Sequence, residues 1–261
     1  MSSFWGKNLK LSLFGESHAN AIGIVIDGLP AGLLLDEEKI AEEMERRKPQ
    51  SSLSTARKEA DRPEILSGFF NGRTTGTPLS AVIYNGNTRS QDYTSLQDVP
   101  RPGHADYTGK IRYGGFQDFR GGGHFSGRLT APLVFAGSLC KQFLSPLGIE
   151  IGAHIANIGA VKDTGFDPVT LDPEMFLSLK GELPFLDREK AAAARQTAED
   201  AAKNGDSVGG SIECAITGLK AGLGDPFFDS AESVLSSLLF SIPAVKGVEF
   251  GAGFRMCEAY G

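Results

Sequence analysis

Cysteine, tryptophan and histidine are scarce in this sequence. Its 261 residues include three cysteines, one tryptophan and four histidines. The cysteines are odd in number, widely spaced and outside any CxxC motif, and they are Cys140, Cys214 and Cys257. This pattern argues against a disulfide framework and against a zinc site, and it favours a reducing compartment. We therefore expect no metal ion in the functional site.

Long apolar runs and an excess of positive charge are also missing. No stretch has the length and apolarity of a membrane span, and the first residues show no signal-peptide pattern. With 26 basic and 32 acidic residues, the net charge is −6. An acidic chain is a poor binder of nucleic acids and membrane surfaces. We expect a cytoplasmic protein with neither nucleic acid nor membrane as a partner.

Glycine, in contrast, is abundant. The 33 glycines occur in short bursts beside polar residues, such as GESH, RPGH, RGGGHFSG and GDSVGG. Glycine lets the backbone adopt positive φ angles or approach a ligand closely. Several such bursts between apolar segments indicate a site that is built from loops.

Apolar periodicity predicts hairpins of strands separated by helices. We expect strands over residues 9–14, 21–27, 63–70, 79–84, 149–161, 208–217 and 248–250. We expect helices over residues 36–47, 126–144, 187–203 and 229–242, and long loops over 50–62 and 85–119. Hairpins that alternate with helices favour an α+β fold over a doubly wound parallel sheet. We see no linker and expect one domain over residues 1–261.

Three of the four histidines lie beside glycines in polar loops. They are His18, His104 and His124. Histidine exchanges protons near neutral pH, so these side chains are candidates for proton transfer. The fourth, His154, lies in an expected strand, and we interpret it as a packed or surface residue.

Two segments could bind anions. The segment RGGGHFSGR, residues 120–128, precedes an expected helix, whose first N–H groups attract anions, and Arg128 adds a guanidinium group. A flexible loop before a helix is the alternative. Arg47 and Arg57 belong to a second basic segment that, taken alone, reads as a solvated helix end. The residues by themselves predict a soluble enzyme that binds a multiply anionic small molecule.

Together these motifs resemble the chorismate synthase family. FGESH at 14–18, RRKP at 46–49, RPGHAD at 101–106 and GHFSGR at 123–128 follow in the family's order. GDSVGG, GLGDPFFD and SIPAVKGVEFGAGF extend the match over essentially the whole chain.

The resemblance implies a carbon–oxygen lyase of the shikimate pathway. Such an enzyme forms chorismate from 5-enolpyruvylshikimate 3-phosphate by 1,4-elimination of phosphate. It requires reduced FMN, and some members use NADPH as the reductant. The implied fold is a layered β-α-β sandwich with helices between antiparallel sheets, and the implied assembly is a homotetramer.

The resemblance also implies roles for individual residues. His18 is the acid near the departing phosphate, and His104 lies by the flavin ring. The residues implied to bind substrate are Arg47, Arg57 and Arg128. Those implied to bind FMN or NADPH are His124, Phe125, Ser126, Glu232, Ser233 and Arg47.

The sequence departs from the family pattern in three places. Ala19 replaces a glycine, which costs about 1 kcal/mol if the position needs positive φ. The loop between Arg47 and Arg57 is shorter than usual, and the family's C-terminal segment is missing. The alternatives are therefore a catalytically incomplete fragment with partial flavin and anion binding, or a phosphate-ester hydrolase that uses His18.

Overall fold

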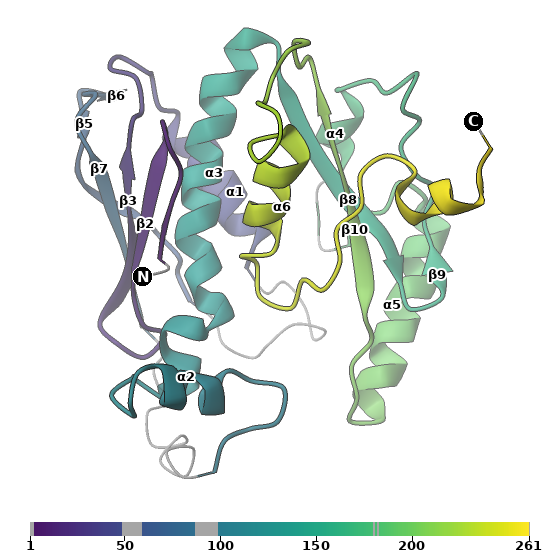
Figure 1. The fold of residues 1–261 in the computed structure, drawn as a ribbon, viewed down its shortest axis with the longest axis horizontal. Coiled ribbons are helices and arrows are strands. Elements are labelled where there is room, and N and C mark those ends of the chain that lie inside the picture. Colours follow the sequence, from purple (N-terminus) through teal and green to yellow (C-terminus); the bar gives the residue numbers. More distant parts are fainter. Residues whose placement is uncertain (1–2, 49–58, 87–98, 180, 182, 261) are drawn as a thin grey trace.

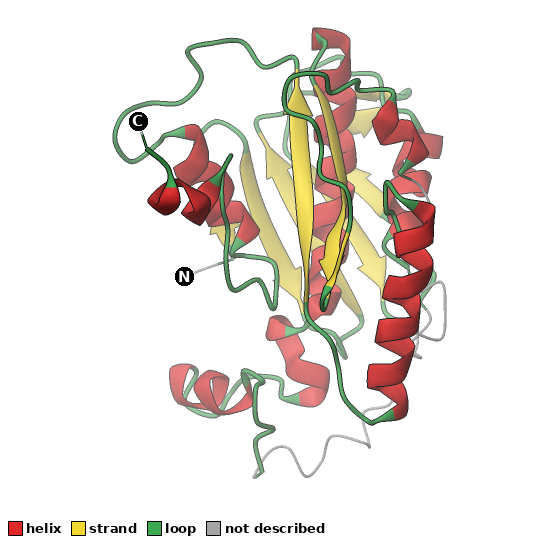
Figure 2. Cartoon of the chain, turned by 90° about the vertical axis from the view of Figure 1, so that its right-hand side faces the viewer, coloured by secondary structure: helices red, strands yellow, loops and turns green. Residues whose placement is uncertain are grey.

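A computed structural model describes residues 3–48, 59–86, 99–179, 181 and 183–260. The described chain has three layers, which are a five-stranded sheet, two helices and a three-stranded sheet (Figure 1). This is the α+β class that the sequence predicts, in the layered β-α-β sandwich that the family resemblance implies. Figure 2 shows the long strands and helices running roughly along one direction.

The five-stranded sheet is antiparallel throughout. The segment AIGIVID forms its middle strand, and the side chains of Ile22, Ile24 and Ile26 are almost fully buried against the helices. Neighbouring strands in order are β1 (Phe4–Trp5), β2 (Lys10–Gly15), β3 (Ala21–Asp27), β7 (Leu79–Tyr84) and β4 (Glu64–Ser67). A two-stranded hairpin, β5 (Phe69–Phe70) and β6 (Arg73–Thr74), lies in the connection from β4 to β7.

The helical layer consists of α1 (Glu37–Arg46) and α3 (Thr130–Leu144), which pack on each other. Asp36 caps α1 by accepting hydrogen bonds from two backbone N–H groups of its first turn, as a capping aspartate does. The apolar helix α3 buries Phe135 and Leu139, and it contacts both β3 and β8. It therefore lies between the two sheets.

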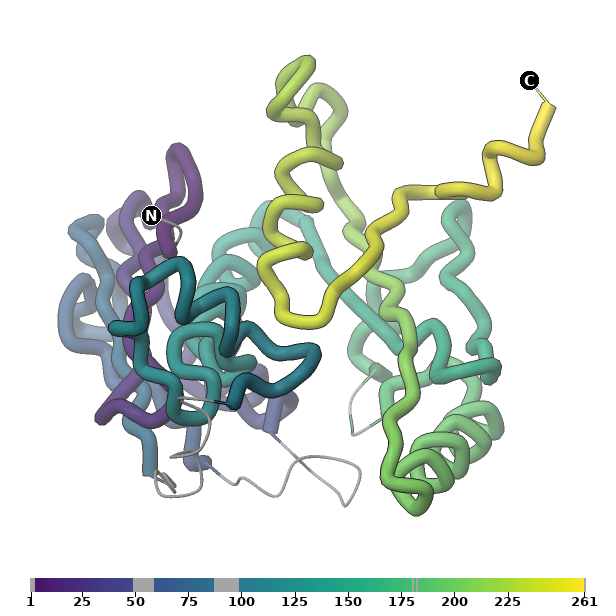
Figure 3. Tube along the Cα trace, turned by 60° about the horizontal axis from the view of Figure 1, so that its bottom comes forward, coloured from purple at the N-terminus to yellow at the C-terminus, as the bar shows by residue number. Residues whose placement is uncertain are grey.

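The smaller sheet has the strand order β10-β8-β9. Helix α5 packs against it at the outer side of the molecule, while α6 buries none of its residues (Figures 1 and 3). The bounds are β8 (Glu150–Ile158), β9 (Val161–Lys162), β10 (Gly210–Thr217), α4 (Met175–Ser178), α5 (Arg188–Lys203) and α6 (Ala231–Leu239).

Most predicted elements are confirmed, with two corrections and three additions. The helix expected from Ser126 begins as a 3₁₀ turn, Gly127–Leu129, and becomes α-helical at Thr130. The strand expected at 248–250 is wrong, because this segment pairs with no described strand. The additions are short elements of three kinds that we did not predict, namely the strands β1 and β6, the helices α2 (Asp106–Arg112) and α4, and 3₁₀ helices such as Gly253–Glu258. The loop expected over 50–62 lies mostly outside the described residues.

Candidate functional site

Three glycine-containing loops meet at one end of the five-stranded sheet. They are the β2–β3 turn with His18, the loop before α2 with Arg101, and the 3₁₀ segment Arg120–Phe125. A Cβ atom built on Gly121 would lie 2.1 Å from Cε1 of His18, and one on Gly122 would lie 4.0 Å from Nη2 of Arg101. The glycines thus allow the backbone to pass directly against the side chains of the other two loops.

His18 is held in a buried position. Its side chain is mostly covered, with 7% of the residue exposed, and Nδ1 lies 3.1 Å from Oγ of the fully buried Ser17. The same hydroxyl lies 3.2 Å and 3.1 Å from the carbonyl oxygens of Arg120 and Gly121. A hydroxyl that donates to one of these carbonyls can accept a hydrogen bond from Nδ1–H, which orients the ring. An imidazole fixed in this way can give or receive protons at a defined position.

A charged pair lies beside this histidine. Arg120 donates to both carboxylate oxygens of Asp118, at 2.8 Å and 2.7 Å. This hydrogen bonding lowers the pKa of Asp118, and the charge of His18 acts in the same direction. Asp118 is therefore a carboxylate at neutral pH, and it can stabilise a positive charge on the His18 ring.

His104 lies at the surface, directly before α2. Its Nδ1 is 3.0 Å from the carbonyl oxygen of Pro102. The turn around it is fixed by Arg101, which donates through Nε and Nη2 to Asp106 at 2.9 Å and 3.0 Å. Hydrogen bonds from Arg101 lower the pKa of Asp106. The result is an exposed imidazole on a rigid turn.

The segment expected to contact FMN lines a cavity of about 450 Å³. The ring of Phe125 is 41% exposed and packs on Tyr113, with 6.1 Å between ring centroids. Oε1 of Gln117 is buried and accepts no hydrogen bond from any described residue. The residues around the cavity are Phe14, Gly15, Glu16, Tyr113, Phe116, Gln117, Asp118, His124 and Phe125.

His124 and Ser126 make structural contacts within this segment. Nδ1 of His124 lies 2.8 Å from the carbonyl oxygen of Gly15, and Nε2 lies 2.6 Å from Oγ of Ser3. Ser126 accepts a hydrogen bond from the backbone N–H of Arg128 and so caps the 3₁₀ turn. Both ring nitrogens of His124 are thus engaged in positioning the glycine-rich segment.

Two of the three predicted substrate arginines share one carboxylate. Asp61 forms ion pairs with Arg47 through Oδ2 and with Arg128 through Oδ1. Burial lowers the pKa of Arg47, and the charge of Arg128 adds to this, while the charge of Asp61 opposes it. Nη2 of Arg128 is buried and has no hydrogen-bond partner in the part of the chain that the structure describes. The third arginine, Arg57, lies outside the described residues.

Asn85 connects this arginine pair with the histidine loop. Its Oδ1 accepts a hydrogen bond from Nε of Arg128 at 3.0 Å. Its Nδ2 donates to the carbonyl oxygens of Glu16 and Ala19, at 3.0 Å and 2.7 Å. Since these two residues flank His18, one amide side chain fixes Arg128 relative to the imidazole.

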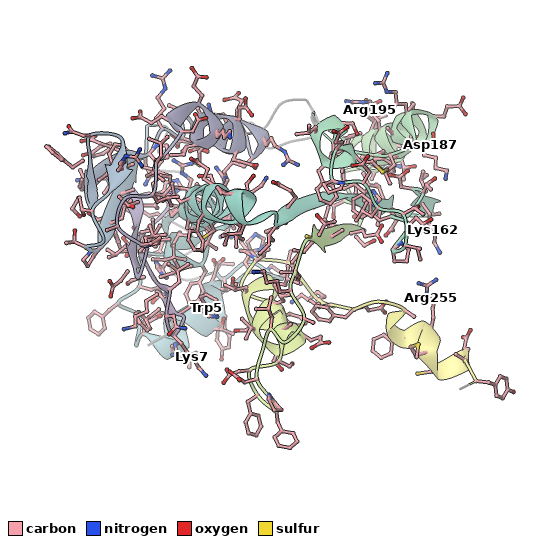
Figure 4. The ribbon with its side chains drawn as sticks, turned by 90° about the horizontal axis from the view of Figure 1, so that it is seen from above. Trp5, Lys7, Lys162, Asp187, Arg195 and Arg255 are labelled. Carbon is pink, nitrogen blue, oxygen red and sulfur yellow. The ribbon has the colours of Figure 1, made fainter. Side chains whose placement is uncertain are left out.

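Glu232 and Ser233 lie at the start of α6. Glu232 is exposed, and the backbone N–H of Ser233 donates to the capping Oγ of Ser230 at 3.2 Å. The preceding segment is joined to the N-terminal hairpin by an ion pair between Lys7 and Asp229. Figure 4 shows Lys7 on the side of the five-stranded sheet that is nearest to α6. Among the described residues, Ser233 forms hydrogen bonds only within its own helix start.

His154 is packed inside the smaller sheet, as its strand position predicts. Its ring nitrogens lie 3.0 Å from Oδ2 of Asp163 and 2.7 Å from Oε2 of Glu213, and Phe166 covers the ring edge-on. Its role is structural, because it joins β8, β10 and the loop after β9.

Sequence reasoning missed Asp61, Asn85 and Ser17. Asp61 belongs to a polar segment with no periodicity, and its φ of 46° could not be read from the residue type. Asn85 directly follows a strand, a place where polar residues often only end the strand. Ala19, in contrast, does not have a positive φ, so the expected cost of replacing glycine there does not arise.

The described residues hold neither a membrane-crossing helix nor a cluster of metal ligands. None of their helices combines the length and the hydropathy that a membrane crossing requires. No group of three or more metal-ligand side chains occurs among the same residues.

Known proteins similar to this chain are chorismate synthases. A family model described as chorismate synthase matches residues 9–261. The chorismate synthase of Thermococcus gammatolerans is 46% identical over 256 residues, which are 98% of this chain and 70% of that protein. That of Chitinophaga pinensis is 44% identical over 261 residues, which are 100% of this chain and 69% of that protein.

A solved structure of a chorismate synthase has the same fold. It gives a TM-score of 0.74 at 29% identity, and the match covers 98% of this chain and 72% of that one. The family match over nearly the whole chain agrees with the fold and with the convergence of the histidine and glycine motifs. The chain belongs to the chorismate synthase family.

Proposed function

We propose that this chorismate synthase eliminates phosphate from 5-enolpyruvylshikimate 3-phosphate in the presence of reduced FMN. The observation that carries the proposal is the link from the His18 loop through Asn85 to Arg128 and Asp61. This link supports a proton donor that acts next to an anion-binding pair. An elimination that releases phosphate needs both.

The arginines bind the anionic substrate. Arg128 holds a buried donor, Nη2, that has no hydrogen-bond partner among the described residues, and a phosphate or carboxylate oxygen would satisfy it. Guanidinium groups stay charged and match the geometry of these anions. Arg47 contributes the second guanidinium group, and we propose the same function for Arg57 on the basis of its motif.

The cavity beside Phe125 fits a flavin. Its lining by aromatic rings suits a flat ring system, and the unpartnered Oε1 of Gln117 suits an N–H donor on the edge of such a ring. His124, Phe125 and Ser126 would hold it here, and Glu232 and Ser233 would add contacts from α6. When bound, reduced FMN supplies electron density to the substrate as phosphate departs and then recovers it.

The two histidines handle protons. His18, fixed by Ser17 beside the Asp118 carboxylate, donates a proton to the departing phosphate. His104, exposed on its rigid turn, stabilises charge at the edge of the flavin. Leaving-group protonation and charge stabilisation are the standard contributions of such groups.

The remaining assignments rest on the family resemblance. We propose that the protein is a single-domain, cytoplasmic carbon–oxygen lyase of aromatic amino acid biosynthesis that works as a homotetramer. We also propose NADPH, bound through Arg47, as the reductant of its flavin.

An anaerobic assay tests the proposed function. The protein is mixed with FMN, a chemical reductant and 5-enolpyruvylshikimate 3-phosphate, and chorismate is measured by chromatography. We expect chorismate to form only when the flavin is reduced. No chorismate from folded, FMN-bound protein contradicts the proposal, and phosphate release without flavin supports a hydrolase instead.

A further inference from the structure

We propose that Asp61 is a positioning residue that joins Arg47 and Arg128 into one anion-binding unit. The inference rests on the proposed function, which assigns both arginines to the substrate. The Asp61 side chain is 2% exposed, and each carboxylate oxygen is engaged by one guanidinium group. Asp61 therefore acts through the arginines.

Charge explains why a buried and a half-buried arginine need this carboxylate. Guanidinium groups do not lose their protons at neutral pH, so two of them close together and away from solvent repel each other. Asp61 lies between Arg47 and Arg128 and offsets this repulsion with two attractions. Two positive charges and one negative charge leave the cluster with one net positive charge, which favours a bound anion.

The hydrogen bonds of Arg128 show which guanidinium nitrogen the Asp61 carboxylate orients toward a ligand. Nε donates to Oδ1 of Asn85 at 3.0 Å, and Nη1 pairs with Asp61, so the planar group is held along two edges. Nη2 is the buried donor that remains without a partner. Buried donors in folded proteins are nearly always paired, which makes this atom the contact that an anion completes.

The backbone at Asp61 is consistent with a fixed position. Its φ of 46° lies in the left-handed region, which few residues other than glycine adopt. Such a conformation persists where surrounding contacts hold it. Here the two ion pairs provide those contacts, and they join a connecting segment to the end of α1 and to the start of α3.

Two variants of Asp61 and one control test the inference. Asp61→Asn keeps the shape and removes the charge. Asp61→Glu keeps the charge and moves it by one methylene, so it protects folding while changing the geometry. Glu43→Gln is the control, because Glu43 pairs with Lys141 across the same two helices without touching the cluster. The KM for 5-enolpyruvylshikimate 3-phosphate, kcat and the melting temperature with and without inorganic phosphate are measured.

We expect both Asp61 variants to raise KM about tenfold or more while kcat changes much less. We expect inorganic phosphate to raise the melting temperature of the wild type and of Glu43→Gln, and to have a smaller effect on the Asp61 variants. A folded Asp61→Glu protein with wild-type KM and a wild-type response to phosphate overturns the inference, even if Asp61→Asn does not fold. Absence of chorismate from the wild type contradicts the proposed function alone, since the phosphate measurement still tests Asp61.

Discussion

Single residues in this protein acquire their surroundings from distant contacts as well as from neighbours in the sequence. His18 stands out in the sequence because of its GESH motif, but its chemistry depends on Ser17, on Asp118 and on the glycine backbone that covers the ring. His124 has a motif of similar appearance, yet both of its ring nitrogens are engaged in structural contacts. Residue type alone therefore does not separate a proton donor from a positioning histidine.

Replacing His18 tests the proposed acid. We expect His18→Asn to lower kcat about 10²–10⁴-fold, because it removes proton transfer to the departing phosphate. Chorismate formation under anaerobic conditions gives kcat, and circular dichroism shows whether the fold is kept. An unchanged kcat in a folded variant would mean that another group supplies the proton.

The negative charge of Asp163 stabilises the fold, and this contribution to stability depends on pH. Burial of its carboxylate disfavours ionisation, but hydrogen bonds from the backbone N–H groups of Leu186, Asp187 and Thr164 and from His154 outweigh burial and lower its pKa. A group whose pKa is lower in the folded state stabilises the fold above its unfolded pKa, which is about 3.9 for aspartate. This contribution is lost as the pH falls through the folded pKa.

We expect Asp163→Asn to lower the free energy of unfolding at pH 7 by about 1–3 kcal/mol, because the buried donors lose a charged acceptor. We also expect the variant to lose less stability than the wild type on acidification below about pH 4. Urea unfolding measured at several pH values checks both. Equal stability of the two proteins at pH 7 would contradict this account of the carboxylate.

At the scale of elements, the glycine-rich segment determines how the loops fit together. Gly121, Gly122 and Gly123 all have positive φ, at 58°, 84° and 53°. A Cβ on Gly123 would lie 2.0 Å from the carbonyl oxygen of Asp118, and one on Gly121 would overlap the His18 ring. The conformation of this segment is therefore determined by close contacts between its backbone and residues of neighbouring loops. Helix α3 begins only after it.

Gly121→Ala tests this close approach. The positive φ costs about 1 kcal/mol, and the methyl group must also displace His18. We expect a lower melting temperature and a fall in chorismate formation of about tenfold or more, by analogy with other misplaced catalytic groups. The matched control is Gly127→Ala in the next turn, where no atom lies within 4 Å of the added Cβ. Equal behaviour of the two variants would show that the overlap is relieved without moving His18.

For the whole molecule, the exposed apolar side chains bear on assembly. Phe227 and Phe228, between β10 and α6, are 87% and 89% exposed. Exposed groups of large apolar residues often mark surfaces that contact other proteins. Together with the family resemblance, this supports a surface that is covered in an assembled homotetramer.

We expect light scattering to give a mass near four times the 27.7 kDa of one chain. Replacing Phe227 and Phe228 together by serine should lower this mass, because apolar contacts are lost. Val169→Ser, at a residue that is 88% exposed on another loop, should leave the mass unchanged. A wild-type mass of one chain would contradict the proposed tetramer.

The sequence by itself determined the hairpin of β2 and β3, the helices α1 and α5 and the family. Alternating apolar residues, a capping aspartate and contiguous motifs are properties of near neighbours in the chain, so they can be read without a structure. The prediction of a strand at 248–250 was wrong because a strand forms only beside a partner strand, and the tertiary fold determines which segments lie side by side.

Only the tertiary structure decided how the site is assembled. Asp61 lies 14 residues from Arg47 and 67 from Arg128, and Asn85 lies 43 from Arg128, so no local pattern could pair them. His18 and Gly121, whose backbone covers the His18 ring, are also far apart in the sequence. Side chains this far apart in sequence meet because two sheets pack on α3. Charged groups that become buried there need partners of opposite charge, and Asp61 pairs with two arginines at once.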